Sequence, residues 1–158
     1  MAEPSGPIAE RNDLGMPELP GGDTIPVREA LDGTLGFHVD ELSADRAVGS
    51  FRVTNAVRQR FGLVHGGAYA AFAEMLASEA TVAEVYPQGQ IAVGLSNDAK
   101  FLRPVSSGVI TATATRLHRG RTTWVWDVVF TDDQGRTCAV SRVTMAVRKR
   151  REDRPGQR

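Results

Sequence analysis

The sequence has few features that would tie it to a membrane, an oxidising compartment or a nucleic acid. Its one cysteine, Cys138, cannot form an intramolecular disulfide, and no cluster of cysteine and histidine suggests zinc. No apolar run approaches the roughly 20 residues that span a bilayer. The 19 Lys and Arg residues balance 19 Asp and Glu residues, so no basic excess favours broad nucleic-acid binding. These absences favour a reducing, cytoplasmic location.

The composition indicates one globular domain with polar segments at both ends. The 158 residues are 41% hydrophobic and 24% charged, which is ordinary for such a domain. Residues 1–26 are rich in Pro, Gly and charge and lack the apolar segment of a secretory signal, so we expect a disordered arm. We expect the domain in residues 27–148 and a flexible basic tail in residues 149–158.

Residues 66–85 have the composition of one long α-helix. The segment contains no proline and is dominated by Ala, Leu, Met and Glu, which favour helices. The loop "FGLVHGG" precedes it, and Pro87 and Gly89 end it. At 1.5 Å per residue the helix would be roughly 30 Å long. Further upstream, residues 27–33 predict a single helical turn closed by Gly33.

Short strands are predicted on both sides of this helix. The candidates are residues 34–42, 46–55, 91–102, 108–118, 122–132 and 137–149. In the fifth of them, Trp124, Trp126, Val128 and Phe130 share one face. Because the last four strands have compact connections, we expect an antiparallel four-strand meander. The result is an α+β domain in which the one long helix lies across the one sheet.

The start of the helix has the elements of a carbonyl-binding site. A helix N-terminus carries unpaired backbone N–H groups, and Gly66 and Gly67 would leave them open to a ligand. Glu74 lies about two turns further on, with Ser78 on the same face. Gln59, before the helix, offers a side-chain amide. A carbonyl polariser and a carboxylate are the minimum for hydrolysing an activated acyl group.

Each of these features also has a purely structural explanation. Glycines before a helix commonly form only a turn, and a glutamate usually lies on the solvated side of a helix. Ser78 is more often a small packing residue, and Cys138 is expected in the core. His38 is expected to be a strand residue with no special role. The pattern "HGG" alone is therefore weak, and the functional hypothesis depends on the combination.

The combination resembles the hotdog-fold acyl-CoA thioesterases over about residues 36–148. The matching segments are "FGLVHGGAYAAFAEMLAS", "VGLSNDAKFLRPV" and "LHRGRTTWVWDVVFTDDQGRTCAVSRVTMAV". The sequence is most similar to the group that contains phenylacetate-pathway thioesterases, 1,4-dihydroxy-2-naphthoyl-CoA hydrolases and one type of 4-hydroxybenzoyl-CoA thioesterase. The resemblance implies a hotdog fold, in which an antiparallel sheet wraps around one long central helix. It also implies hydrolysis of a small to medium-sized acyl-CoA, aromatic acyl groups included.

The resemblance also assigns roles to individual residues. Glu74 matches the catalytic carboxylate, and whether it is the nucleophile or a general base stays open. Gly66 matches the residue whose backbone N–H polarises the thioester carbonyl, and Gln59 matches the amide that assists it. His65 matches a histidine that shapes the pocket. Ser78 matches a hydroxyl residue that helps to position water.

Two further regions are implied to contact the substrate. The turn "HRGRT" falls where the family meets the CoA nucleotide and its phosphates, for which guanidinium groups are suited. Its residues in this role are Arg119, Gly120, Arg121 and Thr122, and a solvated hairpin turn is the alternative. Phe101 stands where we expect a histidine in the dihydroxynaphthoyl hydrolases. This departure puts that substrate in doubt and favours a more apolar acyl pocket.

The resemblance finally implies a homodimer, with a dimer of dimers as an option. Glu74 of one chain would then act with the Gly66 and Gln59 region of the other. No metal or redox cofactor is implied, since coenzyme A is part of the substrate. Two other functions compete: a non-catalytic acyl-CoA-binding hotdog module, and, less favoured, a hotdog dehydratase or hydratase. Glu74 argues against the first, and the second pairs a histidine with an acid at a spacing that this chain lacks.

Overall fold

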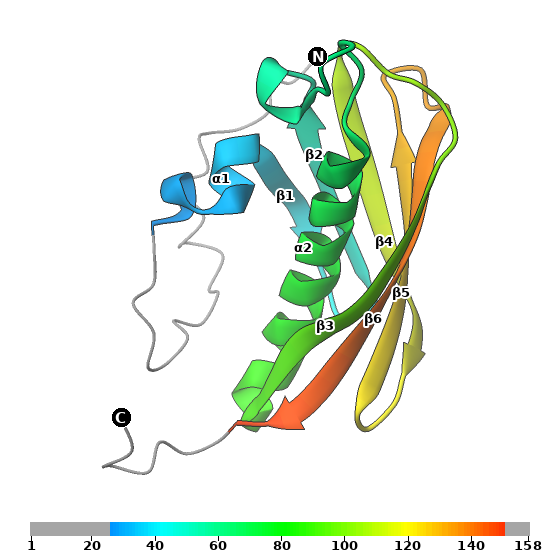
Figure 1. Cartoon of the computed structure of the whole chain (residues 1–158). Coiled ribbons are helices and arrows are strands. Elements are labelled where there is room, and N and C mark those ends of the chain that lie inside the picture. Colours follow the sequence, from blue (N-terminus) through cyan, green and yellow to red (C-terminus); the bar gives the residue numbers. More distant parts are fainter. Residues whose placement is uncertain (1–25, 151–158) are drawn as a thin grey trace.

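A computed structural model describes residues 26–150 as one antiparallel sheet around one long helix (Figure 1). The predicted arm, but for its last residue, and most of the predicted tail lie outside the described residues, so their disorder stays a prediction. The strands are β1 Phe37–Leu42, β2 Arg46–Arg52, β3 Gln90–Phe101, β4 Val109–Arg119, β5 Thr123–Thr131 and β6 Thr137–Lys149. The α-helices are α1 Leu31–Leu35 and α2 Gly66–Val85. This is the hotdog arrangement that the resemblance implied.

The strand order shows that the predicted four-strand meander is wrong in one respect. The order is β1-β2-β4-β5-β6-β3, so β3 pairs with β6 and not with β4. Residues 102–108 therefore cross one end of the sheet, as the chain trace shows (Figure 1). The physical reason is closure around the helix: β1 and β2 cover one side of α2, and β3 must cover the other. As a result β3 is an edge strand, and it packs closely on α2.

The core lies between α2 and the inner face of the sheet. Phe72 and Leu76 of α2 are fully buried, and Phe37 and Phe51 of β1 and β2 pack around the Phe72 ring. Burying each such side chain contributes about 1.5–3 kcal/mol, which is what holds the helix against the sheet. The face predicted for Trp124, Trp126, Val128 and Phe130 is confirmed, because all four are buried. Cys138 is also fully buried, as predicted.

The bounds of α2 agree with the prediction, whereas those of α1 do not. Tyr86–Gln88 forms a 3₁₀ turn after α2, and Gly89 then turns the chain away with a φ of 72°. The upstream turn does not end at Gly33, which lies inside α1. Gly36 ends α1 instead, because it is the residue that adopts the left-handed conformation, with a φ of 70°. None of the helices within residues 26–150 is long and apolar enough to cross a membrane.

Candidate active site

The first turn of α2 presents one free backbone donor. His65 is the N-cap, and its Nδ1 accepts a hydrogen bond from the Gly67 N–H at 2.8 Å. The Ala68 N–H donates to the His65 carbonyl at 2.9 Å. The Gly66 N–H has no acceptor among the described residues. Gly66, rather than Gly67, is therefore the glycine whose N–H is available to a substrate carbonyl.

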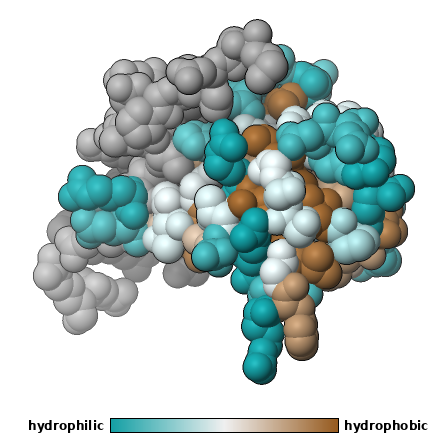
Figure 2. Space-filling view, turned by 90° about the horizontal axis from the view of Figure 1, so that it is seen from above, coloured by the Kyte–Doolittle hydropathy of each residue, from teal (hydrophilic) through white to brown (hydrophobic). Residues whose placement is uncertain are grey.

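The aromatic ring of Phe101 lies over this donor. A Cβ added at Gly66 would lie 2.7 Å from the ring of Phe101, so the ring covers the glycine closely. The Phe101 side chain is still 57% exposed, and Leu102 and Phe61 are exposed as well. The end of the molecule at which α2 begins shows an apolar area bordered by hydrophilic side chains (Figure 2). The free N–H thus lies beside exposed apolar surface.

Glu74 is exposed on the side of α2 that faces β3. Ser78 lies one turn further on and on the same face, as the four-residue spacing predicted, and it donates a hydrogen bond from Oγ to Glu74 Oε1 at 2.8 Å. Gly94 of β3 lies opposite, and a Cβ there would be 3.1 Å from the same oxygen. The second oxygen, Oε2, has no hydrogen-bond partner in residues 26–150. One oxygen is therefore held in place and the other is open.

A single chain does not bring the predicted site residues together. Gly66 and Glu74 are eight residues apart, or about 12 Å along the helix axis. A reacting carbonyl must lie about 3 Å from both its oxyanion donor and its catalytic carboxylate. Gln59 closes the turn before the helix through its backbone, and no described hydrogen bond involves its side chain. The predicted constellation is therefore divided on one chain into two half-sites: Gly66, which Gln59 precedes in the sequence, and the hydrogen-bonded pair of Glu74 and Ser78.

The β4–β5 hairpin holds one of its two predicted arginines firmly. Arg119 forms an ion pair with Glu84 near the end of α2, and the other Glu84 oxygen pairs with Arg116 at 2.9 Å. The guanidinium groups of Arg116 and Arg119 lie 4.8 and 5.1 Å from the centre of the Trp124 ring. In contrast, Arg121 is exposed and has no partner in the described part of the chain.

The other two hairpin residues contribute through their backbones. The Gly120 carbonyl accepts a hydrogen bond from Trp124 Nε1 at 3.0 Å. The Thr122 carbonyl accepts from Arg148 Nη1 at 3.0 Å and from the Val147 N–H at 2.9 Å. These contacts fix the shape of the turn, and Arg121 is the one guanidinium of the predicted set that has no partner in residues 26–150.

Sequence reasoning missed three residues at these places: Gly94, Asn97 and Glu84. A glycine inside a strand pattern often marks a close approach of another element, so Gly94 carried a usable signal. Asn97, whose Nδ2 donates to the Ala70 carbonyl of α2 at 2.8 Å, carried none. Glu84 lies far from Arg119 in the sequence, and only the closure of the sheet around α2 brings them together.

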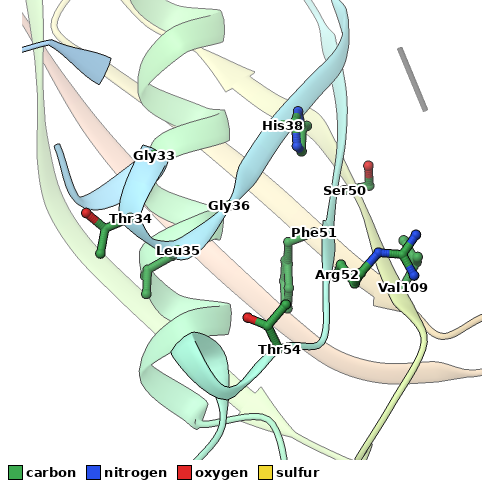
Figure 3. Close-up of a pocket in the computed structure, with 10 residues that line it drawn as sticks. All are labelled: Gly33, Thr34, Leu35, Gly36, His38, Ser50, Phe51, Arg52, Thr54 and Val109. Atoms are coloured by element: carbon green, nitrogen blue, oxygen red, sulfur yellow. The ribbon is translucent and has the colours of Figure 1, made fainter. Parts of the chain in front are cut away.

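A pocket of about 450 Å³ lies away from these residues (Figure 3). His38, Ser50 and Arg52 line it from β1 and β2, and Thr34 and Leu35 line it from α1. None of the sequence-predicted site residues lines it. Residues 26–150 also contain no group of three or more His, Cys, Asp and Glu side chains placed to hold a metal.

The sheet, its central helix and the glycine-headed start of that helix define a hotdog-fold thioesterase class. Residues 61–139 match the family model of the thioesterase superfamily. The chain is 35% identical over 122 residues to the 1,4-dihydroxy-2-naphthoyl-CoA hydrolase of Listeria monocytogenes, covering 77% of this chain and 98% of that protein. It is 39% identical over 127 residues to the proofreading thioesterase EntH of Cronobacter turicensis, and this match covers 75% of this chain and 92% of that protein.

Solved structures agree with these sequence matches. A mutant of thioesterase PA1618 from Pseudomonas aeruginosa has a TM-score of 0.75 at 31% identity, covering 90% of this chain and 95% of that chain. Thioesterase HI1161 from Haemophilus influenzae has a TM-score of 0.71 at 32% identity, and the match covers 78% of this chain and 85% of that chain. The chain belongs to the thioesterase superfamily. The predictions of a hotdog fold and of a thioester-hydrolysing enzyme are thereby confirmed.

Proposed function

We propose that the protein hydrolyses acyl-CoA thioesters to the free acid and CoA, as a homodimer with shared active sites. Each site would combine Glu74 of one copy with the Gly66 N–H and the Gln59 amide of the other. The observation that carries the proposal is Glu74 itself: it is the one carboxylate in the first half of α2, and it is exposed and oriented by Ser78.

The chemistry follows from the two half-sites. The Gly66 N–H and the Gln59 amide would stabilise the oxyanion that forms when the thioester carbonyl is attacked, and one such donor typically contributes about 10²–10³-fold in rate. Glu74 would either take a proton from the attacking water or attack the carbonyl to form an anhydride that water then cleaves. In both routes the C–S bond breaks, CoA leaves as a thiolate and takes up a proton, and the acid is released.

The requirement for a second copy has a geometric basis. The roughly 12 Å between Gly66 and Glu74 on one helix is too long for both to act on one carbonyl. The edge strand β3 offers unpaired backbone groups, and Val93 and Leu95 on it are 50% and 58% exposed. An exposed apolar edge strand favours pairing with another strand. We therefore place the dimer contact along β3, and a dimer of dimers remains part of this proposal.

The acyl group is inferred from the apolar surface beside Gly66. Phe101, Leu102 and Phe61 favour an acyl group with substantial apolar area, aromatic groups included. The relative from Listeria monocytogenes is named as a hydrolase of an aromatic CoA ester, which supports a CoA thioester as the substrate class. Phe101 in place of the expected histidine favours a less polar acyl group than dihydroxynaphthoyl.

The nucleotide end of CoA is assigned to Arg121. Glu84, which anchors the hairpin, lies ten residues beyond Glu74, or about 15 Å along α2. CoA is an extended molecule with its thioester at one end and its phosphates at the other. A phosphate site remote from the carboxylate therefore fits it, and the free Arg121 guanidinium supplies the charge.

A panel of CoA esters tests this function. The parent protein is incubated with acetyl-, hexanoyl-, benzoyl- and phenylacetyl-CoA, and free thiol is measured with a thiol reagent. We expect release of CoA, fastest with an aromatic or medium-chain ester. Binding of these esters without thiol release would favour the binding module and overturn the proposal, and so would hydration of an enoyl-CoA in the absence of hydrolysis.

A further inference from the structure

Asn97 of β3 is joined to the helical turn that carries Glu74. Its Nδ2 donates to the Ala70 carbonyl at 2.8 Å, and in an α-helix the same carbonyl accepts the backbone N–H of Glu74. Ser141 of β6, which is 4% exposed, donates from Oγ to Asn97 Oδ1 at 2.5 Å. The amide is therefore oriented at both of its ends, which leaves it a single geometry.

A β-bulge places Asn97 on the inner face of β3. Gly94 pairs with Met145 and Ser96 pairs with Thr144, so that Leu95 is an extra residue in the strand. Side chains of a regular strand alternate between its two faces, which would separate Gly94 from a residue three positions further on. The bulge shifts this alternation, and both Gly94 and Asn97 face α2.

As a result, β3 contacts α2 at three places along its length. They are Gly94 opposite Glu74, Asn97 opposite Ala70, and Phe101 opposite Gly66. The two outer contacts carry the half-sites of the proposed reaction. The middle contact is the one hydrogen bond that joins α2 to β3 within residues 26–150. The inner residue between it and Phe101 is Ala99, which is too small to interlock with the helix.

We infer that Asn97 is a positioning residue for the reaction, an inference that rests on the proposed function. Its amide fixes α2 along β3, and so it sets the place of Glu74 relative to the edge where the second copy brings its Gly66. Glycine and alanine on β3 would let the helix slide, whereas a directional hydrogen bond does not. A misplacement of about 1 Å at an active site can cost about 10²-fold in rate.

The test compares Asn97→Asp with the parent on the panel ester that the parent hydrolyses fastest. Aspartate keeps the size of the side chain and its bond from Ser141, but it has no N–H to donate to Ala70. We expect kcat to fall about 10- to 100-fold while KM changes little, because the CoA contacts at the hairpin are unaffected. Ser141→Ala, which leaves the donor but frees the amide to turn, should give a smaller fall in kcat.

Thr81→Val is the matched control on the same helix. Thr81 Oγ1 donates to the Ala77 carbonyl at 2.7 Å and accepts from Trp126 Nε1 at 3.0 Å, away from Glu74. This variant should lower Tm and leave kcat unchanged. The positioning role would be overturned if kcat fell in proportion to the loss in Tm in Asn97→Asp, Ser141→Ala and Thr81→Val alike. Full activity of Asn97→Asp would overturn it as well. If Glu74→Gln is also fully active, the proposed function fails instead.

Discussion

Arg119 and Arg121 differ in what holds their guanidinium groups. Arg119 is bound to Glu84 and lies over Trp124, whereas Arg121 has no partner in residues 26–150. We predict that Arg121→Ala raises KM for the acyl-CoA about tenfold and leaves kcat nearly unchanged. A phosphate contact remote from the thioester is equally strong in ground and transition states, and a hydrogen bond to a charged group contributes about 1.5–3 kcal/mol.

Steady-state kinetics at low and moderate salt give the measurement. Arg119→Ala is the comparison, and its effect on KM should be the smaller of the two because its charge is already paired. An unchanged KM for Arg121→Ala at both salt concentrations would remove the hairpin as the nucleotide site.

Tyr69 carries a buried hydroxyl that has no hydrogen-bond partner in the described structure. Burial raises the pKa of this phenol well above its ordinary value near 10, and the neighbouring Cys138 thiol adds to the effect. At a pH above about 10, the folded chain therefore keeps the phenol proton of Tyr69, whereas the unfolded chain loses it. Since the folded state then binds more protons, the free energy of unfolding must fall as the pH rises above about 10.

We predict that Tyr69→Phe reduces the fall in the free energy of unfolding above about pH 10. At pH 7 the substitution should cost little stability, because it removes no hydrogen bond. Urea unfolding of both proteins at pH 7 and pH 10.5 measures it. Equal losses in the two proteins between these pH values would show that Tyr69 does not titrate as described.

At the scale of the elements, the start of α2 depends on the His65 cap. The His65 ring satisfies one of the N–H groups that the first turn leaves unpaired. We predict that His65→Ala lowers the free energy of unfolding by about 1 kcal/mol, whereas His65→Asn keeps most of the parent's stability. Denaturant titrations of the three proteins decide between capping and other roles. If Asn is as destabilising as Ala, the cap is not what His65 contributes.

The elements that could be predicted are those with local signals. The bounds of α2 followed from the glycines at its start and from Pro87 and Gly89 after it. The buried face of β5 followed from the alternation of its side chains. The contact between Glu74 and Ser78 followed from helical periodicity.

The remaining features depend on contacts between distant parts of the chain. The compact connection after β3 does not reveal that this strand pairs with β6, because pairing is decided by closure around α2. The bulge at Leu95 changes which residues of β3 face the helix, and alternation in the sequence gives the wrong face for Asn97. The pairing of Arg119 with Glu84 likewise joins a hairpin to the far end of a helix.

At the scale of the whole molecule, the two half-sites predict subunit complementation. Glu74→Ala and Gln59→Ala, each inactive alone, are mixed under conditions that allow subunit exchange. In a mixed dimer, one site regains both wild-type side chains and the other loses both. With random exchange, activity should rise to about a quarter of the parent's, because half of the dimers are mixed and each has one intact site.

The control mixes Glu74→Ala with Glu74→Gln, which affect the same half-site and should give no recovery. Size-exclusion chromatography with differently tagged copies verifies the exchange. Verified exchange without recovery, or a fully active monomer at assay concentration, would contradict the shared site.

The catalytic role of Glu74 has the most direct test in the turnover of Glu74→Gln beside the parent. Glutamine keeps the shape of the side chain and an oxygen that can accept from Ser78, so the fold, Tm and KM should stay close to those of the parent. It can neither take a proton from water nor attack the thioester. With the fastest ester of the panel, kcat should fall about 10²–10⁴-fold. A variant that releases CoA at nearly the parent's rate would contradict the central claim that Glu74 carries out the hydrolysis.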